Sequence, residues 1–152
     1  AEVWHLVSDR WLSLTSLGSS SNIALTPTPT GVFAAWLGQS WSAPTYSYLE
    51  YPIAHFDGTV WSTLTLTAVE RLTGVTISLT MLGDVPLAAI ASGNNVVNIY
   101  AHRGQMWDPL FLGIGNTNHA IDDGFQITTR AGLTYLVYWT GTRVKLIALD
   151  IP

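Results

Sequence analysis

The sequence contains the heptapeptide HFDGTVW at His55–Trp61, and two related stretches lie elsewhere in the chain, HLVSDRW at His5–Trp11 and HRGQMW at His102–Trp107. Each stretch runs from a histidine through a polar turn to a tryptophan, which is typical of a β-hairpin. The intervals from Trp11 to Trp61 and from Trp61 to Trp107 are 50 and 46 residues, so the 152-residue chain is about three units long. A period of this size indicates a repeat architecture whose units share a core.

The segments around these hairpins read almost entirely as strands. They are short, rich in β-branched and aromatic residues, and mostly bounded by Gly, Pro, Asn, Asp or Ser. A single helical turn is expected at Ala68–Leu72. The predicted strands are Val3–Val7, Trp11–Leu17, Ile23–Thr26, Val32–Leu37, Tyr46–His55, Val60–Thr67, Val75–Leu82, Leu87–Ala91, Val96–Ala101, Trp107–Leu112, Phe125–Thr129, Leu133–Trp139 and Val144–Leu149.

The strand pattern predicts an all-β fold, and the repeat favours a β-propeller with about three four-stranded blades per chain. The Ala-Ala pairs at 34–35 and 88–89 are small side chains that suit an innermost strand beside a central axis. One repeat domain would cover residues 1–152, with units at about 32–82, 87–130, and 133–152 joined by 1–26. The third unit then has one strand too many.

Three blades are too few to close a ring, because propellers typically have four to eight. Two copies would supply six blades, so the sequence predicts a homo-oligomer, most simply a dimer. A β-trefoil, which also repeats three times over about 150 residues, and a β-sandwich or jelly roll remain alternatives.

Composition narrows the classes of partner. Charged residues make up 11% of the chain, the net charge is −4, and Lys145 is the sole lysine. No basic cluster exists to displace counterions from a phosphate backbone, which argues against nucleic acid. No apolar run reaches the roughly 18–20 residues that span a bilayer, so no membrane insertion is expected. Cysteine is absent, and no signal peptide is visible.

The turn at Phe56–Trp61 (FDGTVW) resembles the aromatic-Asp-Gly-x-x-Trp turn of the small six-bladed β-propeller lectins that bind fucose. The resemblance implies that short chains assemble into a propeller, with sugar sites between neighbouring blades and a tryptophan stacked on the sugar. Trp61 is the residue it carries over, with Trp11 and Trp107 as equivalents. The family's glutamate four residues before the aspartate is Ile53 here, and its first-strand arginine has no counterpart in Val32–Trp36.

Physical reasoning also makes the tryptophans candidates, because the apolar C–H face of a pyranose can lie on an indole. Neighbouring polar side chains would hydrogen-bond the sugar hydroxyls. The alternative is that each tryptophan wedges between sheets as part of the core. The candidate ligand-binding residues are Trp11, Trp61, Trp107, His55, Asp57, His102, Gln105 and Asp108.

The three histidines of the hairpins, His5, His55 and His102, could form a zinc site only if they converged on an axis. No paired-histidine motif supports this, so we expect no metal and no cofactor, and the histidines would hydrogen-bond their turns. The chain also lacks a nucleophile elbow, a P-loop and a dinucleotide fingerprint. The sequence thus favours a non-enzymatic, lectin-like protein outside the cell.

The alternative is a structural or receptor-binding component of a viral or phage particle, such as a tail or capsid-decorating protein, without enzymatic activity. Low charge and abundant Ser and Thr fit a virion surface as well as a lectin. A designed repeat protein without a ligand is a third interpretation, which the unequal intervals disfavour.

Overall fold

A computed structural model describes residues 2–7, 10–16, 23–36, 40–42, 47–69, 76–92, 96–104, 106–114, 124–139 and 142–151. All regular structure in these ranges is β-strand, so the all-β prediction is confirmed. No helix in the described ranges is long and apolar enough to cross a lipid bilayer. The strands are β1 (Glu2–Val7), β2 (Arg10–Ser16), β3 (Ile23–Pro27), β4 (Val32–Trp36), β5 (Ser40–Ser42), β6 (Ser47–Phe56), β7 (Trp61–Val69), β8 (Thr76–Leu82), β9 (Val85–Ser92), β10 (Val96–Arg103), β11 (Met106–Ile114), β12 (Phe125–Arg130), β13 (Leu133–Trp139) and β14 (Val144–Leu149).

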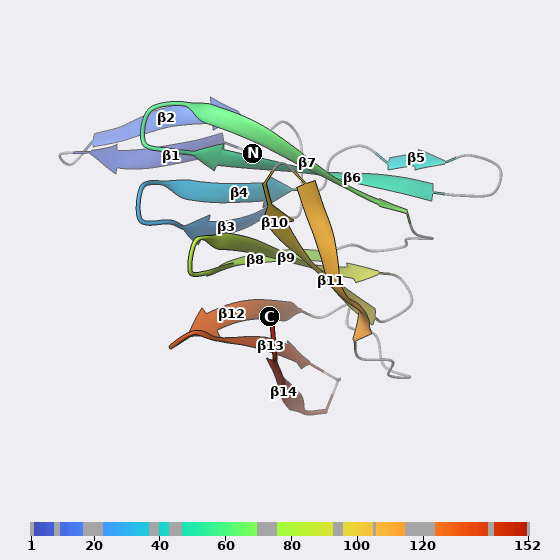
Figure 1. The fold of residues 1–152 in the computed structure, drawn as a ribbon. Helices are drawn as coiled ribbons and strands as arrows, with labels where there is room; N and C mark the ends of the chain where they lie inside the picture. Colours follow the sequence, from blue (N-terminus) through green and yellow to red (C-terminus); the bar gives the residue numbers. More distant parts are fainter. Residues whose placement is uncertain are drawn as a thin grey trace.

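The described strands pair antiparallel in three larger sheets and one hairpin. Sheet I has the order β3-β4-β6-β7, with the short β5 also pairing β6. Sheet II is the meander β8-β9-β10-β11, and sheet III is β12-β13-β14. The hairpin β1-β2 forms a two-stranded sheet of its own. In Figure 1 the strand pairs β3-β4, β8-β9 and β12-β13 lie one below another, so the larger sheets form a row.

All three histidine-to-tryptophan stretches form hairpins, as predicted. In each hairpin the tryptophan pairs with the residue five positions before it: Leu6 with Trp11, Phe56 with Trp61, and His102 with Trp107. The connecting turns differ in length, since Val7 pairs Arg10 and Arg103 pairs Met106 while the turn of Phe56–Trp61 leaves four residues unpaired. The repeat therefore preserves strand register and not turn length.

Register also assigns each side chain to one of two faces, because paired residues share a face and successive residues alternate. The face that carries Ala34 in sheet I, Ala88 in sheet II and Leu136 in sheet III is called the front face. These three residues lie on the second strand of each sheet and pair with its first strand. The opposite, back face carries Ala35, Ala89 and Val137, respectively. These names identify equivalent surfaces along the row.

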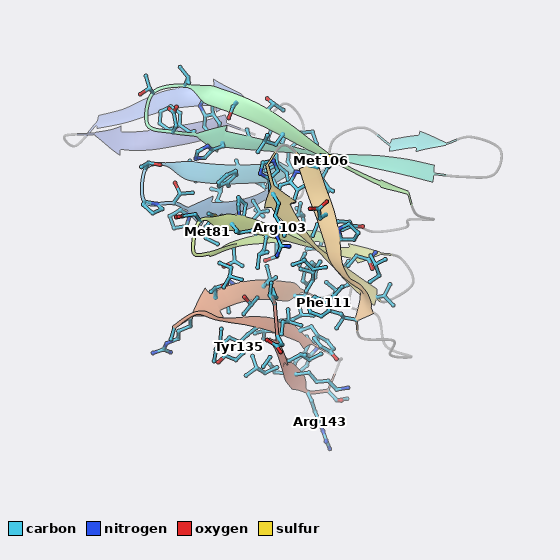
Figure 2. All side chains as sticks on the ribbon, in the orientation of Figure 1. Met81, Arg103, Met106, Phe111, Tyr135 and Arg143 are labelled. Atoms are coloured by element: carbon cyan, nitrogen blue, oxygen red, sulfur yellow. The ribbon has the colours of Figure 1, made fainter. Side chains whose placement is uncertain are left out.

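Two hydrophobic cores fill the spaces between the sheets. The back face of sheet I packs on the front face of sheet II through Phe33, Ala35, Ile53, Leu66, Ile77, Leu79, Ala88 and Ile90. The back face of sheet II packs on the front face of sheet III through Leu87, Ala89, Ala91, Val97, Ile99, Ala101, Phe125, Ile127, Leu136, Tyr138 and Leu149. Met81, labelled in Figure 2, packs at the margin of the first core. Sheet II is thus buried on both faces, and its two cores repeat one packing mode.

The first strand of each sheet contacts the next sheet. The edge strand β8 contacts β3 on one side and β12 on the other. The backbone N–H of Ile127 on β12 donates to the hydroxyl Oγ of Ser78 on β8 at 3.1 Å, in a buried position. This serine gives a partner to an amide of an edge strand, a group that is costly to bury unpaired.

The Ala-Ala pairs do not lie on the first strands of the sheets. β4, β9 and β13 each lie between two paired strands, whereas β3, β8 and β12 are edges. Ala34, Ala35, Ala88 and Ala89 are fully buried because both faces of their strands are covered at these positions. The expectation that these pairs mark innermost strands is therefore wrong, and burial on both faces explains the small side chains.

Two other expectations differ from the structure. The expected helical turn at Ala68–Leu72 is wrong for Ala68 and Val69, which extend β7 and pair with Leu49 and Tyr48; the remaining residues of that turn lie outside the described ranges. The hydrogen-bonded sheets also begin one strand earlier than the expected units, because β8 pairs with β9. Sheet II accordingly spans 76–114, not 87–130.

Candidate ligand site between sheets I and II

The turn of the central hairpin, between β6 and β7, is organised by Asp57. Its carboxylate oxygen Oδ1 accepts hydrogen bonds from the backbone N–H groups of Thr59 (2.8 Å) and Val60 (2.9 Å). The bonds from Val60 and Thr59 lower the pKa of Asp57, since they stabilise the ionised form. Gly58 supplies the positive φ of +99° that the turn requires. The Asp-Gly signature is thus accounted for by turn formation.

This turn is held against the β3–β4 turn by close backbone contact. A Cβ placed on Gly31 would lie 1.7 Å from the carbonyl oxygen of Phe56, and one on Gly58 would lie 3.1 Å from that of Thr30. Glycine at position 31 therefore permits the two turns to touch. The contact positions Thr28, Pro29 and Thr30 beside the end of β6.

A pocket of about 230 Å³ opens between sheets I and II, where the β3–β4 turn lies near the turn that follows β8. Sheet I contributes the β3–β4 turn, Phe33 on β4 and His55 on β6, while sheet II contributes Met81 and Asp84 from the end of β8 and its turn. The lining residues are Thr28, Pro29, Thr30, Phe33, His55, Met81 and Asp84. The pocket therefore combines apolar walls with hydroxyl, imidazole and carboxylate groups.

Two features of the lining bear on what the pocket can hold. The rings of Phe33 and His55 are stacked, with centroids 4.2 Å apart and an interplanar angle of 14°, and their pairing in register fixes this geometry. The Oγ1 atom of Thr28 is buried and has no hydrogen-bond partner among the described residues. A buried hydroxyl without a partner is costly, so a ligand or water that bonds Thr28 would be favoured.

Of the three hairpin tryptophans, the two with described side chains, Trp61 and Trp107, pack against apolar surface. Trp61 lies on the front face of sheet I against Ala34, 5.2 Å from the ring of Phe56. Trp107 packs on the core between sheets I and II, 5.1 Å from the ring of His102. The Nε1 atoms of both tryptophans are buried and have no partner among the described residues. Neither tryptophan lines the pocket described above.

The histidines of the three hairpins are not equivalent positions. His55 shares the back face of sheet I with Phe33, whereas His102 lies on the front face of sheet II, where Trp107 pairs with it. The position of His102 corresponds to that of Phe56, because each pairs with the tryptophan of its hairpin. Burial lowers the pKa of His102. In the described part of the chain no three His, Asp or Glu side chains gather in a way that could hold a metal ion.

Of the eight predicted site residues, the structure brings His55 into the pocket. Asp57 organises the adjacent turn, and Asp108 pairs with Ala101 on the back face of sheet II. Sequence reasoning missed Thr28, Met81 and Asp84, although the Thr-Pro run at 26–30 and Gly83-Asp84 are recognisable turn signals. The side chain of Trp11 and residue Gln105 lie outside the described part of the chain.

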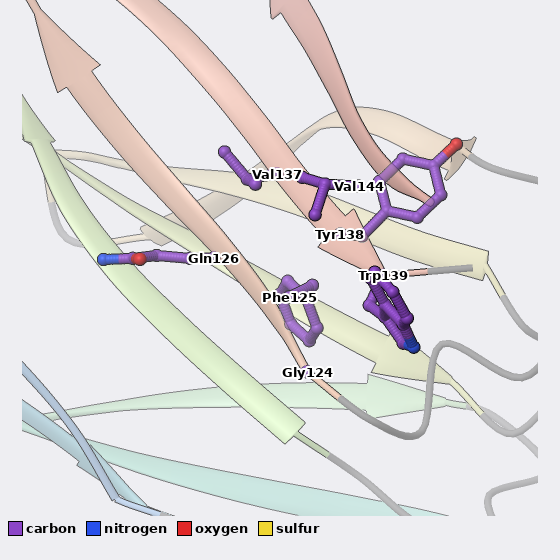
Figure 3. Close-up of a pocket in the computed structure, with 7 residues that line it drawn as sticks. All are labelled: Gly124, Phe125, Gln126, Val137, Tyr138, Trp139 and Val144. Carbon is purple, nitrogen blue, oxygen red and sulfur yellow. The ribbon is translucent and has the colours of Figure 1, made fainter. Parts of the chain in front are cut away.

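A second pocket of about 280 Å³ lies on sheet III (Figure 3). It is lined by Gly124, Phe125, Gln126, Val137, Tyr138, Trp139 and Val144. In Figure 3 the Gln126 side chain points away from Phe125 and Trp139. No carboxylate or imidazole is among its lining residues, so we regard it as a packing surface and not as a polar ligand site.

Comparisons of the chain with protein families, with curated proteins and with solved structures find no match.

Proposed function

We propose that this protein binds carbohydrate without catalysis, in the pocket between sheets I and II, as part of a propeller-like homo-oligomer. The observation that carries the proposal is the lining of this pocket. The stacked Phe33–His55 pair and Met81 supply apolar surface, while the buried, unpartnered hydroxyl of Thr28 and the carboxylate of Asp84 supply polar groups.

This combination suits a sugar ring. Small-molecule sites are mostly apolar, with a few polar groups that fix orientation, and a pyranose offers C–H surface together with hydroxyl donors and acceptors. The volume of about 230 Å³ is small for a ligand site, which favours a single ring or the end of a glycan. A carboxylate accepts hydrogen bonds from neighbouring sugar hydroxyls, and its bonds to them are stronger than neutral ones.

Binding is favoured over hydrolysis by the acid groups of this pocket. Glycoside hydrolysis ordinarily uses two carboxyl groups separated by about 5–10 Å. Among the residues that line the pocket, Asp84 supplies one carboxylate and no second.

The propeller-like arrangement is supported by how the sheets pack. Sheets I, II and III repeat one face-to-face packing mode, and contacts between their first strands β3, β8 and β12 bring one edge of each sheet together. In a propeller, blades pack in this way around an axis. We propose that the three sheets are successive blades and that further blades come from another copy of the chain.

The sugar proposal is tested by a glycan array followed by titration calorimetry on any glycan that binds. Asp84→Asn and Thr28→Val are expected to weaken binding at least tenfold, because each removes a polar group of the pocket. Asp108→Asn, which makes the same change on β11 and away from the pocket, is expected to bind as the original chain does. Trp61→Phe is likewise expected to bind normally, since Trp61 lies on the other face of sheet I.

Loss of binding in Trp61→Phe with retention in Asp84→Asn would overturn the assignment to this pocket. An array without any bound glycan would overturn the sugar proposal, and the viral structural role would then be the better hypothesis.

A further inference from the structure

The row of sheets ends in two faces that no described large sheet covers: the front face of sheet I and the back face of sheet III. Within the row, back faces always pack on front faces. We propose that the back face of sheet III docks onto the front face of sheet I of a second copy of this chain, so that the packing within the molecule continues between molecules. This names the surfaces of the homo-oligomer proposed above, and it rests on sheet packing and not on the sugar site.

Equivalent positions show that the β3 edge of the front face of sheet I is exposed, although Ala34 and Ala54 at the centre of that face are buried. Register aligns Ile23 and Leu25 of β3 with Ile77 and Leu79 of β8 and with Phe125 and Ile127 of β12. Ile77 and Leu79 are 5% and 7% exposed because sheet I covers them, whereas Ile23 and Leu25 are 43% and 56% exposed. The same apolar pattern is thus present on sheet I without the sheet that would bury it.

The back face of sheet III likewise has apolar residues that no described sheet covers. Val137 occupies the position that Ala89 has in sheet II, where the back face is buried. On sheet III, Leu133, Val144 and Leu146 are 54%, 65% and 64% exposed, and Trp139 is also exposed. Tyr135, labelled in Figure 2, belongs to this face through its pairing with Ala148.

Both end faces combine apolar side chains with few charged positions, and register places Glu50 on the front face of sheet I. Among the described residues of sheet III, register places one charged residue on the back face, Arg130, which lies beside the turn to β13. Contiguous exposed apolar surface of this kind marks an interaction site. Since the two faces differ, the contact is head-to-tail, which closes into a ring or extends as a filament according to the rotation between copies.

Sedimentation velocity or light scattering of the full chain tests the proposal. The original chain should assemble to at least about twice the 16.5 kDa of one chain. Leu25→Lys on the front face of sheet I and Leu146→Lys on the back face of sheet III should each give a folded monomer. Both leucines are exposed in the single chain, so the lysines should not disturb its folding. Circular dichroism of each variant verifies this. Leu112→Lys, at an exposed position on β11 of sheet II, should assemble normally.

Mixing the two monomeric variants gives the decisive result. Leu25→Lys retains an intact sheet III face and Leu146→Lys an intact sheet I face, so the mixture should form a one-to-one dimer. A monomeric original chain, an equal effect of Leu112→Lys, or assembly of either variant alone would overturn the proposal. Glycan binding by the monomeric Leu25→Lys variant separates the two proposals, because the pocket lies within one chain.

Discussion

At the scale of single residues, the structure separates positions that look alike in sequence. His55 and His102 each begin a turn before a tryptophan, yet they lie on opposite types of face. His55 stacks on Phe33 in the pocket, while His102 replaces the Phe56 of the preceding unit beside a tryptophan. A histidine at an aromatic packing position has a consequence for stability, because burial disfavours its charged form.

We predict that His102 makes the fold acid-sensitive near neutrality. Its pKa is lowered in the folded state from the ordinary 6.5, so as pH falls below about 6.5 the unfolded chain takes up a proton before the folded chain does. The free energy of unfolding should therefore decrease between pH 7 and pH 5. His102→Phe introduces the side chain that Phe56 has at the equivalent position, and it should remove this part of the decrease.

Urea denaturation of both chains at several pH values measures this effect. At pH 8, where the histidine is neutral in both states, the difference between the two chains reports packing alone and serves as the reference. Identical pH slopes for the original chain and His102→Phe would show that position 102 does not titrate differently on folding.

At the scale of elements, edge strands are completed by side chains of the neighbouring sheet. We predict that Ser78→Ala lowers the free energy of unfolding by about 1–3 kcal/mol, because it leaves the buried Ile127 N–H without its acceptor. Ser62→Ala is the matched control. The hydroxyl of Ser62 donates to the carbonyl oxygen of His55 at an exposed site, so its loss should cost at most about 0.5 kcal/mol. Equal effects of the two changes in thermal or urea denaturation would contradict the role of Ser78.

Strand positions were largely predictable from sequence, whereas strand grouping was not. Short β-branched runs between Gly, Pro and Asn gave bounds that agree with the structure for β13 and β14 and nearly agree for most other strands, while the three-residue β5 at Ser40–Ser42 was missed. The residue pattern of a single strand does not show which neighbour it pairs with, so it does not say whether β8 pairs with β7 or with β9. The pocket depends on that grouping, because Thr28 and Asp84 meet only when sheets I and II pack. Turn residues carry no local signal of a contact with a distant turn.

At the scale of the whole molecule, one packing mode accounts for both cores and for both exposed ends. Sheets I, II and III are three occurrences of one apolar pattern, and the ends are the places where that pattern has no partner within the row. The end faces leave isoleucine, leucine, valine and tryptophan side chains exposed to water, and burying such side chains is favourable, which is the basis for proposing that a second copy covers them.

Cross-linking between copies tests this continuity most directly, since the chain has no cysteine of its own. Within one chain, Ser78 of sheet II accepts a hydrogen bond of 3.1 Å from the amide of Ile127 in sheet III. Gln126 occupies in sheet III the register position that Ser78 has in sheet II, and Leu25 occupies in sheet I the position that Ile127 has in sheet III. If the packing continues between copies, Gln126 of one copy therefore lies beside Leu25 of the next. A mixture of Leu25→Cys and Gln126→Cys chains should therefore form a covalent dimer with a short thiol-to-thiol reagent. Either variant alone should remain uncross-linked, and so should a control mixture of Leu112→Cys and Gln126→Cys. Equal cross-linking in the control mixture, or none in the test mixture, would contradict the continuation of the sheets from one copy into the next.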